Sequence, residues 1–201
     1  MNKRRVVVTG LGVLAPNGIG VSNFEQALRE GKSAISFDPE LKKHSFSCQV
    51  SARMPLSEED IKKMNRDLRL VKMKENSITF GIAAIKEAWE DAGFKFSPDD
   101  QPRWETGCIM GNEAPSIDVI KWVLPLILDG KVRQVGSKTV QQSQNSGITG
   151  YITQKLGLAN LVCVTAQACA TGNLAIAQAF ERIQLGKADR MIAGSSETQG
   201  K

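Results

Sequence analysis

Histidine is scarce in this sequence, since His44 is the only one among 201 residues. A mechanism that needs two histidines therefore cannot be completed by this chain alone. The sequence also lacks any apolar run near the roughly 18 to 20 residues that cross a bilayer. Its basic start leads into only three valines, whereas a signal peptide needs a longer apolar core. We therefore expect a soluble, cytoplasmic protein with no membrane span.

Cysteine is sparse as well, and the four cysteines form no CxxC pair. This spacing argues against a disulfide framework and a zinc site, so we expect reduced thiols and no metal site. We also expect no cofactor. Hydrophobic residues make up 41% of the chain and charged residues 23%, proportions that exclude collagen-like, disordered and coiled-coil classes. The cysteines are Cys48, Cys108, Cys163 and Cys169.

Charge is unevenly distributed along a chain whose net charge is +5. Lys155 is the only charged side chain in residues 139–180, and a stretch so poor in charge is expected in a core, an interface or the lining of a site. Residues 60–75 hold six basic side chains against three acidic ones. Because the acids are interleaved and no aromatic residues accompany the bases, we expect no nucleic acid partner.

Strand and helix patterns alternate along the chain, which predicts an α/β layer built on a mostly parallel sheet. The clearest helix covers residues 75–91, where apolar residues recur every three or four positions and Gly93 follows as a stop. The expected strands cover residues 5–9, 104–110, 161–165 and 190–193, with a short one around 48–51. The other expected helices cover residues 23–29, 117–128 (interrupted or bent near Pro125), 146–156 and 170–185.

A glycine-rich turn after the first expected strand is one candidate site. Gly10, Gly12 and Ala15 fit the G-x-G-x-x-A fingerprint of dinucleotide folds. However, Pro16 follows where the helix should already be running, and no second strand ends in an acidic residue about 20 positions later. These observations favour a simple turn, and a nucleotide-binding α/β protein remains the alternative.

Cys169 is the second candidate, because a strand leads through small residues to this cysteine and a helix of small and apolar residues begins there. The amino end of a helix stabilises the nucleophilic thiolate, and its N–H groups can hold the oxygen of a thioester's tetrahedral intermediate. The alternative is a buried cysteine that packs as a small hydrophobe. Cys108 and Cys163 fall within strands and are expected in the core, while Cys48 has no helix start beside it.

Three segments resemble the β-ketoacyl-acyl-carrier-protein synthases, the elongating condensing enzymes of the thiolase superfamily. They are residues 4–18, residues 168–172 (Ala-Cys-Ala-Thr-Gly) and residues 188–197, and their order and separations agree across the chain. The resemblance implies a thiolase-like fold, with a mixed, mostly parallel sheet and helices on both faces. It also implies that residues 1–201 correspond to the N-terminal half of a ketosynthase domain, without the C-terminal half.

The resemblance implies a two-step acyl transfer. Cys169 would take an acyl group from the phosphopantetheine thioester of an acyl carrier protein, and malonyl carrier protein would then condense with it by decarboxylation. The family's two histidines, lysine and glutamate lie in the second half, so we expect no complete condensation by this chain alone. Gln167 stands where the family has a small hydroxyl residue, which bears on substrate preference.

Further roles are implied by the same resemblance. The acyl-pocket residues would be Gly111, Asn112 and Asn145. The carrier-docking residues would be Lys62, Lys63, Arg66 and Arg133, for which a solvated helix face is the alternative. We expect a homodimer or heterodimer, with a large apolar face exposed where the second half would pack. A non-catalytic partner subunit of a heterodimeric ketosynthase is the remaining alternative.

Overall fold

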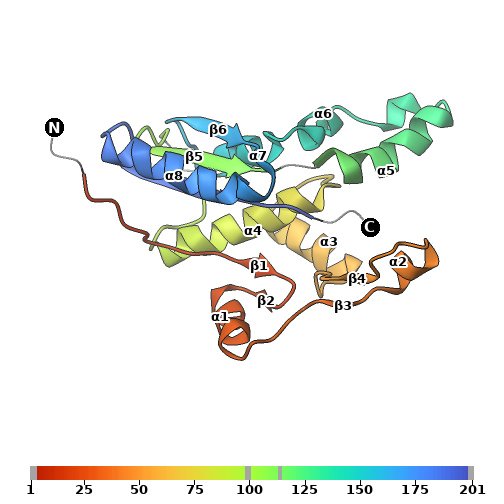
Figure 1. Ribbon diagram of the computed structural model, residues 1–201. Coiled ribbons are helices and arrows are strands. Elements are labelled where there is room, and N and C mark those ends of the chain that lie inside the picture. The colour runs from red at the N-terminus through yellow and green to blue at the C-terminus, as the bar shows by residue number, and fades with distance from the viewer. Residues whose placement is uncertain (1–3, 98–100, 113–114, 199–201) are drawn as a thin grey trace.

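A parallel sheet organises the computed structural model, which describes residues 4–97, 101–112 and 115–198. Strand β5 (Thr106–Gly111) lies between β6 (Val162–Thr165) and β7 (Arg190–Ser195), and both pairs are parallel (Figure 1). Gly111 is in register with Thr165 on one side and Ser195 on the other. The three strands therefore end together at one carboxyl edge.

Helices cover both faces of this sheet, as expected. Helix α8 (Thr171–Gln184) lies across one face, and α7 (Gly147–Leu156) packs on the other with α4 (Asn76–Asp91) against it (Figure 1). The apolar stripe predicted for residues 75–91 is confirmed, because it faces the core between the sheet, α4 and α7. The most buried residues of this core are Ile78, Ile82, Cys108, Ile148, Ile152 and Leu156.

The remaining elements surround this centre. They are β1 (Leu14–Ala15), β2 (Gly18–Ile19), α1 (Val21–Arg29), β3 (Ser36–Phe37), α2 (Pro39–Lys43), β4 (Val50–Ser51), α3 (Glu58–Asp67), α5 (Pro115–Leu128), α6 (Lys138–Ser143) and two short 3-10 turns, η1 (Val132–Gln134) and η2 (Ala168–Ala170). Within the described residues, every helix is too short or too polar to cross a bilayer. Helix α8 leaves Ile176 and Phe180 exposed on its outer side.

The predicted buried strand over residues 5–9 is wrong. This segment is extended but joins neither the central sheet nor the short ladders, and Val7 and Val8 are 62% and 75% exposed. The chain meets α4 only after this segment, where the Leu11 amide donates to the Asp91 carboxylate (2.9 Å).

The glycine pair at the start of the chain has a structural explanation. A Cβ atom on Gly10 would lie 2.1 Å from the Ala88 carbonyl oxygen, and one on Gly12 would lie 1.9 Å from that of Ala84. Both glycines thus allow the backbone to rest directly on α4. The β1–β2 hairpin follows where a dinucleotide fold would begin its helix, so the fingerprint's structural context is missing.

Three details of the predicted elements also need correction. Strand β5 begins at Thr106 instead of residue 104, and Trp104 is 70% exposed. Helix α1 begins at Val21 instead of residue 23, after Gly20, whose φ of 83° supplies the turn into the helix. Helix α5 is continuous through Pro125, so the predicted interruption is wrong.

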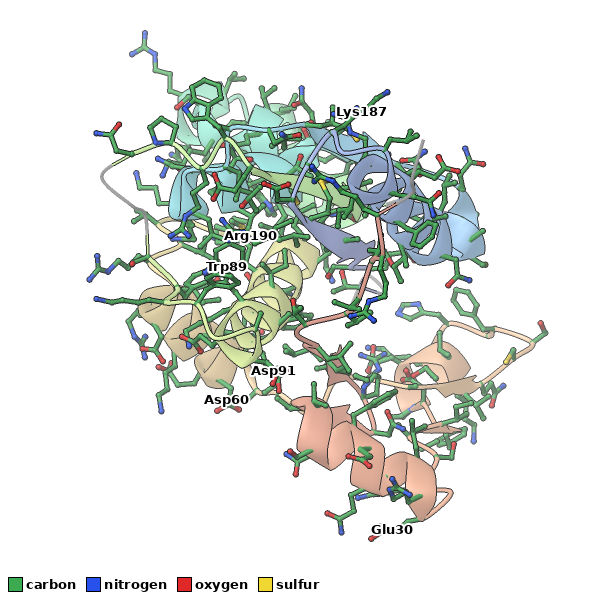
Figure 2. The ribbon with its side chains drawn as sticks, turned by 90° about the vertical axis from the view of Figure 1, so that its left-hand side faces the viewer. Glu30, Asp60, Trp89, Asp91, Lys187 and Arg190 are labelled. Carbon is green, nitrogen blue, oxygen red and sulfur yellow. The ribbon has the colours of Figure 1, made fainter. Side chains whose placement is uncertain are left out.

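The amino edge of the sheet is closed by side chains near the strand starts. Arg190 of β7 forms an ion pair with Glu105, and its Nε donates to the Thr106 hydroxyl (3.1 Å). Arg103 lies over the Trp89 ring, 5.1 Å from its centroid. Figure 2 shows Trp89 and Arg190 in neighbouring positions, at the end of α4 and the start of β7. The cysteine singled out from the sequence lies at the other end of the strands.

Candidate functional site

Cys169 lies in a sharp elbow between β6 and α8, and the side chain is exposed. Ala168 has a left-handed backbone, with φ of 47°, which reverses the chain immediately before the cysteine. The Gln167 amide donates to the Thr171 hydroxyl (2.7 Å), and the Ala170 amide donates to the Gln167 carbonyl (3.0 Å). These bonds hold the elbow, which we define as residues 165–171, in one conformation.

The elbow is locked onto the carboxyl edge of the sheet by small residues. Thr171 is 1% exposed, and a Cβ on Gly111 would lie only 1.8 Å from the Thr171 Cγ2 atom. On the other side, a Cβ on Gly172 would lie 2.8 Å from the Ser195 Oγ atom. The first turn of α8 can therefore reach the strand ends only because both positions are glycine.

The four cysteines differ sharply in environment. Cys108 is fully buried, and burial raises the pKa of its thiol. Cys163, expected in the core, lies in β6 and is half-buried; burial raises the pKa of this thiol, and the Arg182 charge opposes the rise. Cys48 is exposed on a loop. Only Cys169 combines exposure with a helix start, which contradicts the view of it as a buried hydrophobe.

Gly111 and Asn112, two of the predicted pocket residues, lie at and just beyond the end of β5. Gly111 contacts the elbow through Thr171, as described above. Asn112 is 1% exposed and turns toward α4, where its Nδ2 donates to the Ser77 hydroxyl (2.8 Å). Ser77 in turn donates to the Glu75 carboxylate (2.7 Å). The structure therefore shows Asn112 in a buried polar network, and its predicted role in an acyl pocket stays a prediction.

This polar network was not predicted from the sequence. Ser196, which follows β7, joins it by donating from its hydroxyl to the Ser77 carbonyl (2.7 Å). The network ties the amino end of α4 to the ends of β5 and β7. Glu75 caps the amino end of α4, because its carboxylate accepts a hydrogen bond from the Ser77 amide. Of the residues in this network, only Glu75 could have been identified from the local sequence, as an acidic residue at the start of the predicted helix.

Asn145 lies half-buried in the turn between α6 and α7. The turn is followed by Gly147, where a Cβ would lie 2.5 Å from the Gln141 carbonyl oxygen. This close packing fixes the start of α7. The position of Asn145 beside an acyl group stays a prediction.

The predicted docking residues fall on two elements. Lys62, Lys63 and Arg66 are exposed on α3, where Arg66 also pairs with Glu59 (3.1 Å). Arg133 is exposed on η1, which follows α5 (Figure 1). The structure thus brings three of the four basic side chains together on one short helix.

Neither the histidine nor the acidic residues form a metal centre in the part of the chain that is described. No three His, Cys, Asp or Glu side chains gather there as metal ligands would. His44 is the residue that ends α2, and its Nε2 atom lies 4.0 Å from the Glu40 carboxylate. The chemistry that the described site offers is therefore that of a thiol at a helix start.

Comparisons with known proteins agree with this geometry. The sequence matches the family described as beta-ketoacyl synthase, N-terminal domain, over residues 3–201. Nodulation protein E of Rhizobium leguminosarum bv. trifolii is 34% identical over 197 residues, which are 96% of this chain and 47% of that protein. The 3-oxoacyl-acyl-carrier-protein synthase 2 of Coxiella burnetii is 30% identical over 199 residues, 98% of this chain and 46% of that protein.

A solved structure gives the same result. The structure of a type II polyketide ketosynthase, bound to the hexaketide and in complex with its acyl-carrier protein, matches with a TM-score of 0.73 at 25% identity. The match covers 98% of this chain and 46% of the other. This chain thus spans about half the length of the curated relatives and of the solved chain it matches.

Replacing Gly111 with alanine tests the contact that locks the elbow. The added Cβ would collide with Thr171, so we expect Gly111→Ala to lower the free energy of unfolding by about 1–3 kcal/mol, as overpacked cores do. Gly194→Ala in the neighbouring strand is the matched control, because its Cβ would meet only the Met110 side chain at an ordinary 3.5 Å. The free energy of unfolding of both variants can be measured by urea denaturation. Equal values for the two variants would contradict this explanation.

Proposed function

The chain belongs to the β-ketoacyl synthase family, and on this premise we propose that Cys169 is the acyl-accepting nucleophile of a β-ketoacyl-acyl-carrier-protein synthase. The observation that carries the proposal is the exposed thiol in η2, the turn that leads directly into α8, at the carboxyl edge of a parallel sheet. Parallel α/β sheets place their sites at this edge.

The proposed reaction of this chain's residues is acyl transfer. The Cys169 thiolate attacks the carbonyl carbon of an acyl thioester on the carrier's phosphopantetheine, forming a tetrahedral oxyanion. The dipole and N–H groups at the start of α8 stabilise this oxyanion. The intermediate then collapses, the acyl–Cys169 thioester forms, and the carrier thiolate leaves and takes up a proton.

The second step is assigned outside this chain. Decarboxylation of malonyl carrier protein and attack of its carbanion on acyl-Cys169 would need the paired histidines that the family resemblance implies, and this sequence holds only His44. We therefore propose that residues 1–201 form the N-terminal half of a ketosynthase domain. The exposed Ile176 and Phe180 of α8 offer an apolar surface for further packing.

The partner of this reaction is proposed to be an acidic acyl carrier protein. We define the basic face of α3 as the exposed Lys62, Lys63 and Arg66, which lie on a helix that also exposes Glu58, Glu59, Asp60 and Asp67. Opposite charge speeds association with an acidic partner. The carrier protein in the matched polyketide complex is the partner of that ketosynthase, which supports the same class of partner here. We place the reaction in the cytoplasm of the cell and in a homodimer or heterodimer.

Transfer of an acyl group from a carrier to Cys169 tests the nucleophile. The full-length protein, incubated with acyl carrier protein thioester, should gain the mass of one acyl group, and Cys169→Ala should abolish this gain. Cys48→Ala, which removes the other exposed thiol, is the control and should keep it. A wild-type protein that gains no acyl group would favour the non-catalytic partner subunit instead.

Charge reversal on α3 tests the docking surface. We expect Lys62→Glu combined with Lys63→Glu to slow acylation from the carrier by at least about tenfold at low salt, because electrostatic steering is lost. The rate with a small N-acetylcysteamine thioester should not change. Lys187→Glu, an exposed lysine in the turn after α8 (Figure 2), is the control. An equal effect of both variants on the carrier reaction would contradict docking on α3.

A further inference from the structure

Gln142 is a fully buried polar side chain in the last turn of α6. Its amide group bonds to two backbone groups of a segment far away in the sequence. The Lys74 amide donates to Gln142 Oε1 (2.8 Å), and Gln142 Nε2 donates to the Lys72 carbonyl (3.1 Å). One side chain therefore satisfies a donor and an acceptor of the backbone, as a neighbouring strand would.

The segment held in this way is the connector between α3 and α4, which we define as residues 68–75. Leu68, Leu70 and Met73 face the core, whereas Arg69 and Lys72 are exposed. Three apolar residues thus anchor the connector, while Arg69 and Lys72, together with the apolar Val71, face outward. The connector follows α3 directly in the chain.

The shape of the connector is not a local preference of its sequence. Arg69 and Lys72 both have left-handed backbones, with φ of 51° and 58°, and this conformation is costly for side chains of their type. Such residues persist only when the surrounding structure holds them. The two bonds from Gln142 fall at Lys72 itself and two residues later, which identifies Gln142 as part of that support.

The connector also touches the helices that follow the sheet's central strand. The Lys74 Nζ atom lies 5.8 Å from the ring centroid of Trp122 on α5. Lys155 of α7 is partly buried, and burial lowers its pKa, with a smaller contribution from the nearby Arg69 charge. On the α7 side, burial raises the pKa of Tyr151, and the neighbouring Gln142 amide partly opposes the rise. Gln142 therefore sits where the connector, α6 and α7 meet.

We propose that Gln142 is a positioning residue for carrier docking, which holds Arg69, Lys72 and Lys74 in a fixed arrangement for an acidic carrier protein. This inference rests on the proposed function, because it assumes that the basic face binds a carrier. A connector released from Gln142 would have to be ordered when the carrier binds, and that ordering weakens association. Cys169 itself lies in η2, outside this bond pair, so we expect its intrinsic reactivity to be unchanged when the pair is lost.

The test separates carrier-bound from small substrates. Gln142→Met keeps the length of the side chain but removes both amide bonds. In the full-length protein, we expect this change to raise the KM for acyl carrier protein thioester by about tenfold. An effect of this size is typical when one or two hydrogen bonds that order a binding segment are lost. The kinetics with an N-acetylcysteamine thioester should stay unchanged, and hydrogen exchange at the Lys74 amide should become faster. Gln144→Met, a nearby exposed glutamine, is the control.

Several results would overturn the proposal. An unchanged KM for the carrier thioester in Gln142→Met, with an active wild type, would show that the connector needs no such support. Equal losses with both thioesters would show a general structural role. If Gln142→Met does not fold, Gln142→Asn keeps the amide at a shorter reach and should give an intermediate KM. A wild-type protein that reacts with the small thioester but not with the carrier thioester would refute the proposed partner. The rate of hydrogen exchange at the Lys74 amide does not depend on the partner, because it reports only on the hydrogen bonds to Gln142.

Discussion

The close contact between Gly111 and Thr171 is the constraint on which the candidate site depends. Three parallel strands end in register, and α8 must begin directly above their ends if Cys169 is to lie at the sheet edge. A side chain at either glycine of this contact region, Gly111 or Gly172, would push the first turn of α8 away. The position of the thiol is therefore set by the absence of side chains as much as by the residues that are present.

The same principle explains the start of the chain, where glycine has a different use from the one its spacing first indicates. Gly10 and Gly12 lie on the α4 backbone, and the Val13 amide donates to the Glu87 carboxylate (2.9 Å). A glycine pair in G-x-G spacing thus serves helix packing here. Spacing alone cannot separate this use from phosphate binding, because both require a backbone that approaches another group closely.

The elements that the sequence predicts best are those whose signals are local. The helix α4 follows from the apolar period that ends in Trp89, and the elbow follows from small residues around Cys169. The wrong strand at residues 5–9 had the right composition, but a strand needs a partner, and the partner cannot be read from the segment itself. Gln142 and Asn112 were missed as structural residues for the same reason, since their partners lie 68 to 70 and 35 positions away.

The reactivity of the four thiols in the folded full-length protein is the most direct test of Cys169 as the activated nucleophile. Mass spectrometry after timed exposure to iodoacetamide gives a separate rate of modification for each cysteine. Because Cys169 lies at the start of α8, we expect it to react faster than Cys48, although both are exposed, and we expect the buried Cys108 to be protected. A Cys48 that reacts as fast as Cys169 or faster would contradict an activated thiol at the start of α8.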